Sequence, residues 1–201
     1  TELQKENINN EKINKDIDLI ASQSNRCREI LKKLTLNPNV EDKFLDNKIL
    51  IIDYINEIVR SYEEISDKNF LIISDKYNHP IKSNKSTEII YGLRNFIGNA
   101  NKFSNKKVEI FLHSDKKITE INIIDDGPGF PDDLIKKHIL GEPYIRSADQ
   151  ADISKYGLGL GTFIGKTLLE KNFANIKFTN SEKTGGAEVI IKWKNDDLVK
   201  I

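Results

Sequence analysis

Apolar residues recur mostly at three- and four-residue steps over residues 1–36, a stretch without Gly or Pro. They are Ile13, Ile17, Ile20, Ala21, Cys27, Ile30, Leu31 and Leu34. This spacing predicts an amphipathic helix with a narrow apolar stripe, ended or interrupted near "TLNPNVEDK". A long helix with so thin a stripe needs a partner helix to cover it.

From about residue 43 onward, helical and strand-like patterns alternate along the chain. Helices are predicted over 49–65, from Ser86 or Thr87 as N-cap to about residue 104, over 131–139 with Pro131 in the first turn, and over 158–172. Strands are predicted over 70–76, 107–114, 117–125, 174–180 and 187–194, with 107–125 forming a hairpin. Residues 141–157 are polar and irregular. The pattern therefore predicts a helical piece over residues 1–42, followed by an α+β domain over residues 43–201.

Charge is balanced across the chain, because Lys+Arg and Asp+Glu each total 31 of the 201 residues. With no net charge there is no global field to attract nucleic acid or an anionic membrane. Hydrophobic content of 38% and charged content of 31% describe a soluble, rather polar protein. Any anion-binding site must therefore be local.

The single cysteine and the start of the sequence give information about the cellular compartment and about the longer protein. Cys27 alone cannot form an intrachain disulfide, which favours a reducing compartment. No apolar run approaches the length of a membrane span, and no signal peptide opens the sequence. Because the chain begins with Thr and contains no Met, we expect it to be a fragment of a longer protein.

The stretch "DDGPGF" (125–130) places carboxylates and glycines directly after a predicted strand. A buried Asp is costly unless it is hydrogen-bonded, and glycine allows a ligand to approach the backbone closely. We therefore interpret Asp125 with Gly127 and Gly129 as one half of a ligand site.

Two asparagines on the helix before this strand, Asn95 and Asn99, are four residues apart and share a face. Their amide oxygens suit a hard cation such as Mg²⁺, and Lys102 on the same face could meet a phosphate. The alternative is that these are simply solvated helix residues. "YGLGLG" (156–161) opens a helix, where backbone N–H groups form an anion site, or else it is a flexible loop.

The order of these stretches resembles the N, G1 and G2 boxes of the GHKL ATPases, the group that contains histidine kinases, DNA gyrase B, Hsp90 and MutL. The resemblance covers about residues 45–195, and "GGAEVIIKW" at 185–193 matches the turn before the family's last strand. It implies the Bergerat fold, a two-layer α/β sandwich with a mixed sheet, and ATP with Mg²⁺ as ligands.

The resemblance also implies roles for individual residues. Asp125 would accept a hydrogen bond from the adenine amino group, Gly127 and Gly129 would give the ring room, and Phe103 would lie against it. Asn99 would be the principal Mg²⁺ ligand and Asn95 a second or water-mediated one, with Lys102 as a phosphate contact. The G2 box would bind the triphosphate through Gly157, Leu158, Gly159, Leu160, Gly161 and Thr162. Residues 141–156 would form the ATP lid, with Arg146 and Lys155 as its phosphate-reaching cations.

Asn95 separates the branches of this group. Gyrase, Hsp90 and MutL carry a Glu there to activate water, whereas Asn cannot act as a general base, so an ATP-hydrolysing role is disfavoured. Histidine kinases have Asn there and transfer the phosphoryl group to a histidine on a helical hairpin. "RCREIL", "YGLRNFIGNANKFS", "DDGPGFP", "LGEPY" and "GLGLGTFIGKTLLEK" are similar to the RegB/PrrB/ActS group of redox-responsive sensor kinases.

That group implies the cytoplasmic core of a homodimeric sensor kinase in a bacterial inner membrane, with a response regulator as partner. The membrane would be reached only through segments upstream of residue 1. Residues 1–42 would be the second part of the dimerisation and phosphotransfer hairpin. Cys27 would be a redox site, or else a small apolar residue in the stripe.

One departure from the family concerns the phosphate acceptor. The family's acceptor histidine is followed by an acidic residue, and His79, His113 and His138 have no such neighbour. We interpret all three as surface or structural residues, so the fragment should bind ATP without phosphorylating itself. A nucleotide-dependent interaction module without kinase turnover is the alternative function.

Overall fold

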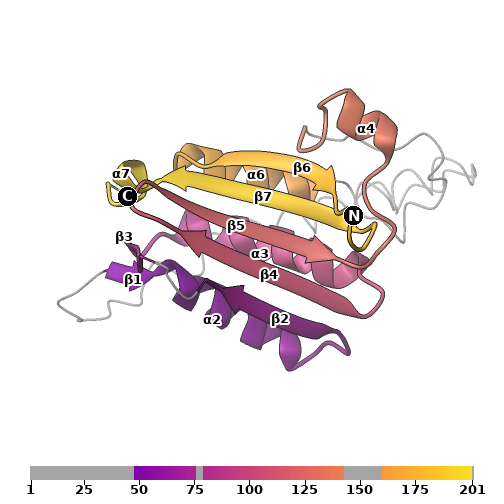
Figure 1. The fold of residues 1–201 in the computed structure, drawn as a ribbon, viewed down its shortest axis with the longest axis horizontal. Coiled ribbons are helices and arrows are strands. Elements are labelled where there is room, and N and C mark those ends of the chain that lie inside the picture. The colour runs from indigo at the N-terminus through magenta and orange to yellow at the C-terminus, as the bar shows by residue number, and fades with distance from the viewer. Residues whose placement is uncertain (1–47, 76–78, 143–159, 201) are drawn as a thin grey trace, which may run out of the picture. The chain divides into compact units, whose positions relative to one another are not determined.

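A five-stranded mixed sheet, in the order β2-β4-β5-β7-β6, forms one layer of the fold (Figure 1). The computed structural model describes residues 48–75, 79–142 and 160–200, which belong to one compact unit, Asp46–Ile201. Its strands are β1 Lys48–Leu50, β2 Asn69–Ser74, β3 Lys82–Asn84, β4 Lys107–Ser114, β5 Ile118–Asp125, β6 Asn175–Asn180 and β7 Ala187–Lys194. Its helices are α2 Ile51–Glu63, α3 Thr87–Phe103, α4 Asp132–Lys136, α6 Leu160–Lys171 and α7 Asn195–Leu198. Strand β2 runs parallel to β4, and the other neighbouring pairs of this sheet are antiparallel.

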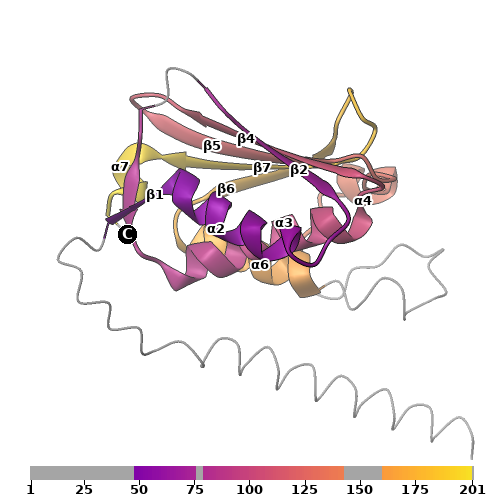
Figure 2. The same cartoon turned by 90° about the horizontal axis from the view of Figure 1, so that it is seen from below.

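Helices α2, α3 and α6 lie together on one face of this sheet (Figure 2). Strand β5 shows why, because its residues alternate between half-buried and buried along the whole strand. Ile121, Ile123 and the final residue Asp125 share the buried phase. The α+β two-layer sandwich expected from the sequence is confirmed, and the alternation delivers Asp125 to the helix side of the sheet.

Three short elements were not predicted from the sequence. Residues Ile49 and Leu50, expected to start a helix, form β1 instead, because β1 pairs antiparallel with β3 and the Ile51 N–H donates to the Ile81 carbonyl at 3.2 Å. The third element, α7, follows β7 directly. Pro131 occupies the N-cap position of α4 rather than its first turn. The helix predicted over residues 1–36 lies outside the described residues, and the division at residues 42 and 43 stays a prediction.

Helix α3 is fixed at its start and packed closely along its length. The Ser86 side chain caps it by accepting a hydrogen bond from the Ile89 N–H at 3.3 Å, as predicted for a residue at this position. At Gly92, an added Cβ would lie 2.5 Å from Cγ of Leu169 on α6. The absence of a side chain there lets the two helices approach closely, which sets the position of everything they carry.

Helices α4 and α6 end in the same way, each with a residue in the left-handed region where glycine is usual. Phe173 has φ of 63° and His138 has φ of 54°. After α6, the N–H groups of Phe173 and Ala174 donate to the carbonyls of Glu170 and Leu169, both at 3.0 Å, which is the Schellman pattern. A residue with a Cβ is strained in this backbone conformation, which lowers the stability of the folded state. The Phe173 ring is 59% exposed, so its burial offsets little of this strain.

Replacing Phe173 by Gly is therefore expected to stabilise the protein by about 0.5–1 kcal/mol. Thermal or denaturant unfolding measures the change. Phe173→Ala is the matched control, because it removes the same ring but keeps Cβ, and it should bring no gain. Equal stabilities of the two variants would contradict the proposed backbone cost.

An exposed ion pair joins the end of β2 to β4. Nδ1 of His113 contacts Oδ2 of Asp75, and this hydrogen bond raises the pKa of His113 above its ordinary value. A raised pKa means that the folded state favours the protonated imidazole. The stabilisation is thus complete below the pKa of the unfolded chain, near 6.5, and is lost as the pH rises through the higher folded value.

His113→Gln should consequently destabilise the protein at about pH 5.5 and have a smaller effect at about pH 8.5. Urea unfolding of both proteins across this range provides the measurement. Asp75→Asn should reproduce the same pH trend, since it removes the other partner. A difference that does not depend on pH would show that the pair contributes nothing through protonation.

Candidate functional site

Asp125 is the most buried charged side chain of the candidate site, with 4% of its surface exposed. Its Oδ1 accepts hydrogen bonds from the N–H groups of Gly127 at 2.8 Å and Ala187 at 3.1 Å. Burial raises the pKa of this carboxyl group despite these donors. Both hydrogen bonds that the described residues make to this carboxylate end on Oδ1 rather than on Oδ2.

The glycines around Asp125 are required by protein packing. A Cβ on Gly127 would lie 2.3 Å from the Phe103 carbonyl oxygen, and one on Gly186 would lie 2.0 Å from the carbonyl oxygen of Asp125. Gly129 has φ of 75° and packs against the Gly185 carbonyl. These contacts with the protein itself require glycine at these positions, and the room that Gly127 and Gly129 would give a ring stays a prediction.

Two residues that the sequence reasoning missed hold this turn from the side of β6 and β7. Asn180 binds Phe130 twice, accepting from its N–H at 2.6 Å and donating to its carbonyl at 2.9 Å. The Thr184 hydroxyl donates to the Asp125 carbonyl at 2.8 Å. The only signal in the sequence was the glycine-containing turn before the last strand. That pattern does not indicate that the turn packs against the end of β5.

Asn95 and Asn99 share a face of α3, as their spacing predicted, and the structure brings this face to the start of α6. A Cβ built on Gly161 would lie 3.5 Å from Oδ1 of each asparagine. Nδ2 of Asn95 donates to the Tyr91 carbonyl at 2.8 Å, and Nδ2 of Asn99 donates to the Thr162 hydroxyl at 3.3 Å. Each amide thus makes this hydrogen bond through Nδ2, and an amide oxygen is a group that can bind a cation.

Lys102 and Phe103 lie at the end of α3, between the asparagines and the Asp125 turn. Nζ of Lys102 lies 5.1 Å from the centroid of the Phe103 ring. Lys102 is exposed and Phe103 is half-buried. The structure thus gathers Asn95, Asn99 and the half-buried Leu160, Gly161 and Thr162 in one place, with Phe103 packed by its backbone against the Asp125 turn.

Several predicted residues lie outside the described part of the chain. They are Cys27, Arg146, Lys155, Gly157, Leu158 and Gly159. Their roles stay predictions. The three histidines, His79, His113 and His138, are all exposed, which agrees with their interpretation as surface residues.

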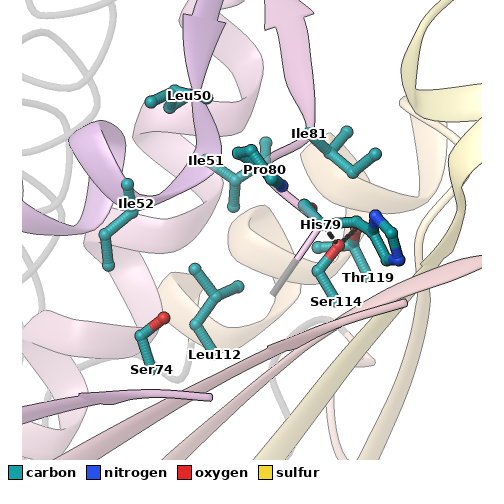
Figure 3. A pocket seen from close by; sticks show the side chains of 10 residues that line it. All are labelled: Leu50, Ile51, Ile52, Ser74, His79, Pro80, Ile81, Leu112, Ser114 and Thr119. Carbon is teal, nitrogen blue, oxygen red and sulfur yellow. Dashed lines mark hydrogen bonds between the residues drawn. The ribbon is translucent and has the colours of Figure 1, made fainter. Parts of the chain in front are cut away.

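Figure 3 shows a separate apolar pocket. It lies near the Ser114–Thr119 end of the β4–β5 pair, whereas Asp125 pairs with Val108 at the other end. It is lined by Leu50, Ile51, Ile52, Ser74, His79, Pro80, Ile81, Leu112, Ser114 and Thr119. The Ser114 hydroxyl donates to the His79 carbonyl at 2.9 Å, and the Thr119 hydroxyl donates to Asn195 Oδ1 at 2.8 Å. These two hydroxyl groups therefore donate hydrogen bonds within the protein. The pocket does not include Asp125.

Among residues 48–75, 79–142 and 160–200, no helix combines the length and apolar character that crossing a membrane requires. The same residues contain no cluster of three or more His, Cys, Asp or Glu side chains suited to a metal ion. A cation at this site would therefore depend on the amide oxygens of Asn95 and Asn99.

Comparison with known proteins places this geometry in a family. The signature of the histidine kinase-, DNA gyrase B- and HSP90-like ATPase family matches residues 84–197. The sensor histidine kinase RegB of Cereibacter sphaeroides is 28% identical over 205 residues, covering 92% of this chain and 43% of RegB. The sensor protein KdpD of Clostridium acetobutylicum is 27% identical over 148 residues, covering 68% of this chain and 15% of KdpD. The chain thus spans less than half the length of these relatives.

Solved structures share the fold at low identity. The mycobacterial sensor histidine kinase MprB superposes with a TM-score of 0.62 and 22% identity, covering 73% of this chain and 97% of that structure. The catalytic domain of histidine kinase ThkA gives a TM-score of 0.60 and 20% identity, covering 74% of this chain and 96% of that structure. With the family signature spanning more than half of the sequence, the chain belongs to the histidine kinase-, DNA gyrase B- and HSP90-like ATPase family.

Proposed function

We propose that this chain is the ATP-binding catalytic region of a sensor histidine kinase of the RegB type. It would transfer the γ-phosphoryl group of ATP to a histidine upstream of residue 1, for relay to an aspartate of a response regulator. The observation that carries the proposal is the pair of amides from Asn95 and Asn99 at the start of α6, where a general base for hydrolysis would otherwise stand. The RegB relatives support the choice of branch.

The residues present fit Mg²⁺ as a hard, oxygen-seeking cation. Two amide oxygens converge near Gly161, and Mg²⁺ commonly takes few protein ligands while keeping water and substrate phosphates. Asn99 and Asn95 would hold it. The cation would supply neutralisation of charge on the phosphates, which is its usual part in phosphoryl transfer.

The chain's own residues would bind and orient the nucleotide. Oδ2 of Asp125 would accept a hydrogen bond from an exocyclic amino group, which adenine offers and guanine lacks at that position, and this is supported by the two backbone donors that hold Oδ1. The half-buried Phe103 would flank the ring, and Lys102 with the N-terminal turn of α6 would meet the phosphates. Phosphoryl transfer needs mainly such positioning, with the acceptor supplied from elsewhere.

The remaining parts of the proposal concern the longer protein. Residues 1–42 would belong to the dimerisation hairpin of a homodimer, residues 141–156 would form the ATP lid, and Arg146 and Lys155 would reach the phosphates from it. Cys27 would respond to oxidation. The longer protein would be a membrane-anchored sensor with this region in the cytoplasm, a proposal supported by the likeness to the sensor kinase RegB.

Asn99→Ala is expected to abolish Mg²⁺-dependent binding of a non-hydrolysable ATP analogue, because it removes the principal amide oxygen. Calorimetric titration with and without Mg²⁺ measures the effect. Asn101→Ala is the matched control on the same helix, since the Asn101 amide oxygen accepts from Ser66 at 2.6 Å instead. Equal loss in both variants, or none in Asn99→Ala, would contradict the assignment.

Asp125→Asn is expected to reduce the preference for the ATP analogue over a GTP analogue by about tenfold, since one charged hydrogen-bond acceptor is replaced. Wild-type binding should also weaken as the pH falls through the raised pKa of Asp125, because protonation removes the acceptor. The variant should lack this pH dependence. An unchanged preference with an unchanged pH profile would exclude Asp125 as the base-reading group.

Kinase activity itself is tested by supplying the acceptor separately. A hairpin peptide that carries the upstream histidine should become phosphorylated by this chain with ATP and Mg²⁺, detected by transfer of a labelled γ-phosphate. Saturable ATP binding without any transfer would instead favour a nucleotide-dependent interaction module.

A further inference from the structure

Asp126, the neighbour of Asp125, binds the backbone of residues 105–107. Its Oδ1 accepts hydrogen bonds from the N–H groups of Asn105 at 2.8 Å, Lys106 at 3.0 Å and Lys107 at 3.1 Å. The Asn105 side-chain amide donates back to the Asp126 carbonyl. Burial alone would raise the pKa of Asp126, but these backbone donors outweigh it and hold the pKa below its ordinary value.

The segment that Asp126 holds is the connection between α3 and β4. This connection begins one residue after Phe103, and the Phe103 carbonyl fills the space beside Gly127. The end of α3 and the Asp125 turn therefore meet backbone to backbone, with no side chain between them. Since backbone packing is this tight, a small shift of the connection must move Phe103 relative to Asp125.

We propose that Asp126 is a positioning residue for nucleotide binding, which fixes the end of α3 in register with Asp125. The inference rests on the proposed function, because Phe103 and Asp125 are taken as the two groups that receive the base. Asp126 acts by holding the connection. The Asp126 carboxylate thereby sets the spacing between the Phe103 ring and the Asp125 carboxylate. Its charge also raises the pKa of the neighbouring Asp125 carboxyl, and Asp126→Asn, which lacks that charge but keeps the acceptor, separates the two effects.

The chain offers a matched control in Asp115. It binds the turn between β4 and β5 in the same manner, with Oδ1 accepting from the N–H groups of Lys117 at 2.6 Å and Ile118 at 2.7 Å. The strand register places this turn at the other end of β4 and β5, eight residues of strand away. Asp115→Ala therefore removes a comparable turn anchor without touching the candidate site.

Asp126→Ala is expected to weaken binding of the ATP analogue by about tenfold and to reduce its preference over the GTP analogue. Asp126→Asn keeps an oxygen acceptor, so it should retain most of the affinity for the ATP analogue and most of the preference over the GTP analogue. Asp115→Ala should match the wild type in both, whatever it does to thermal stability. Wild-type affinity and preference in Asp126→Ala would overturn the proposal, as would the same loss in Asp115→Ala.

Hydrogen exchange of the wild-type protein gives a second test, which does not depend on whether a variant folds. By linkage, nucleotide binding should increase protection of the Lys106 and Lys107 amides and leave those of Lys117 and Ile118 unchanged. Unchanged protection at Lys106 and Lys107 in nucleotide-bound protein would overturn the proposal. Failure of the wild type to bind the analogue at all would instead count against the proposed function.

Discussion

The buried carboxylate of Asp125 is the constraint around which the candidate site is arranged. A carboxylate this well buried needs hydrogen-bond donors, and it finds them in the backbone of Gly127 and Ala187, which lie 60 residues apart in the chain. The end of β5 must therefore meet the start of β7. Gly186 is required there because any side chain would collide with the Asp125 backbone.

A second constraint is the close approach of α3 and α6. The Leu169 side chain packs directly against Gly92. A Cβ added to Gly165 would lie 3.1 Å from the Phe96 ring and 3.2 Å from Cβ of Asn95. Small residues thus set the helix spacing, and the spacing brings the start of α6 to the asparagine face of α3. Gly161 at the start of α6 can lie beside both asparagine amides only because the helices pack this closely. In this way the packing of the apolar layer determines the geometry of the polar site.

Family membership and reaction rest on different observations. The sheet order and the helix layer are shared with solved histidine kinase domains at identities near one fifth, which establishes the fold alone. The reaction is inferred from which groups the site contains, above all an amide at residue 95 where other branches have a carboxylate. Catalysis of this kind depends on orientation, so residues that hold the site in shape, such as Asp126, matter without touching the ligand.

The sequence alone predicted the elements with strong periodicity and the residues that short-range spacing brings together. The long helices and strands of the described residues were predicted correctly. Asn95 and Asn99 share a face because helical geometry fixes the positions of residues four apart. Elements stabilised by distant partners were missed, as β1 shows, since it is extended only through its pairing with β3. The same reason hid Asn180 and Thr184, because side chains that act across 50 or more residues leave no local pattern. The sequence therefore determined the elements and the kinds of chemistry they carry, whereas the tertiary structure decided which strand ends and helix ends meet, because those contacts depend on packing between distant segments.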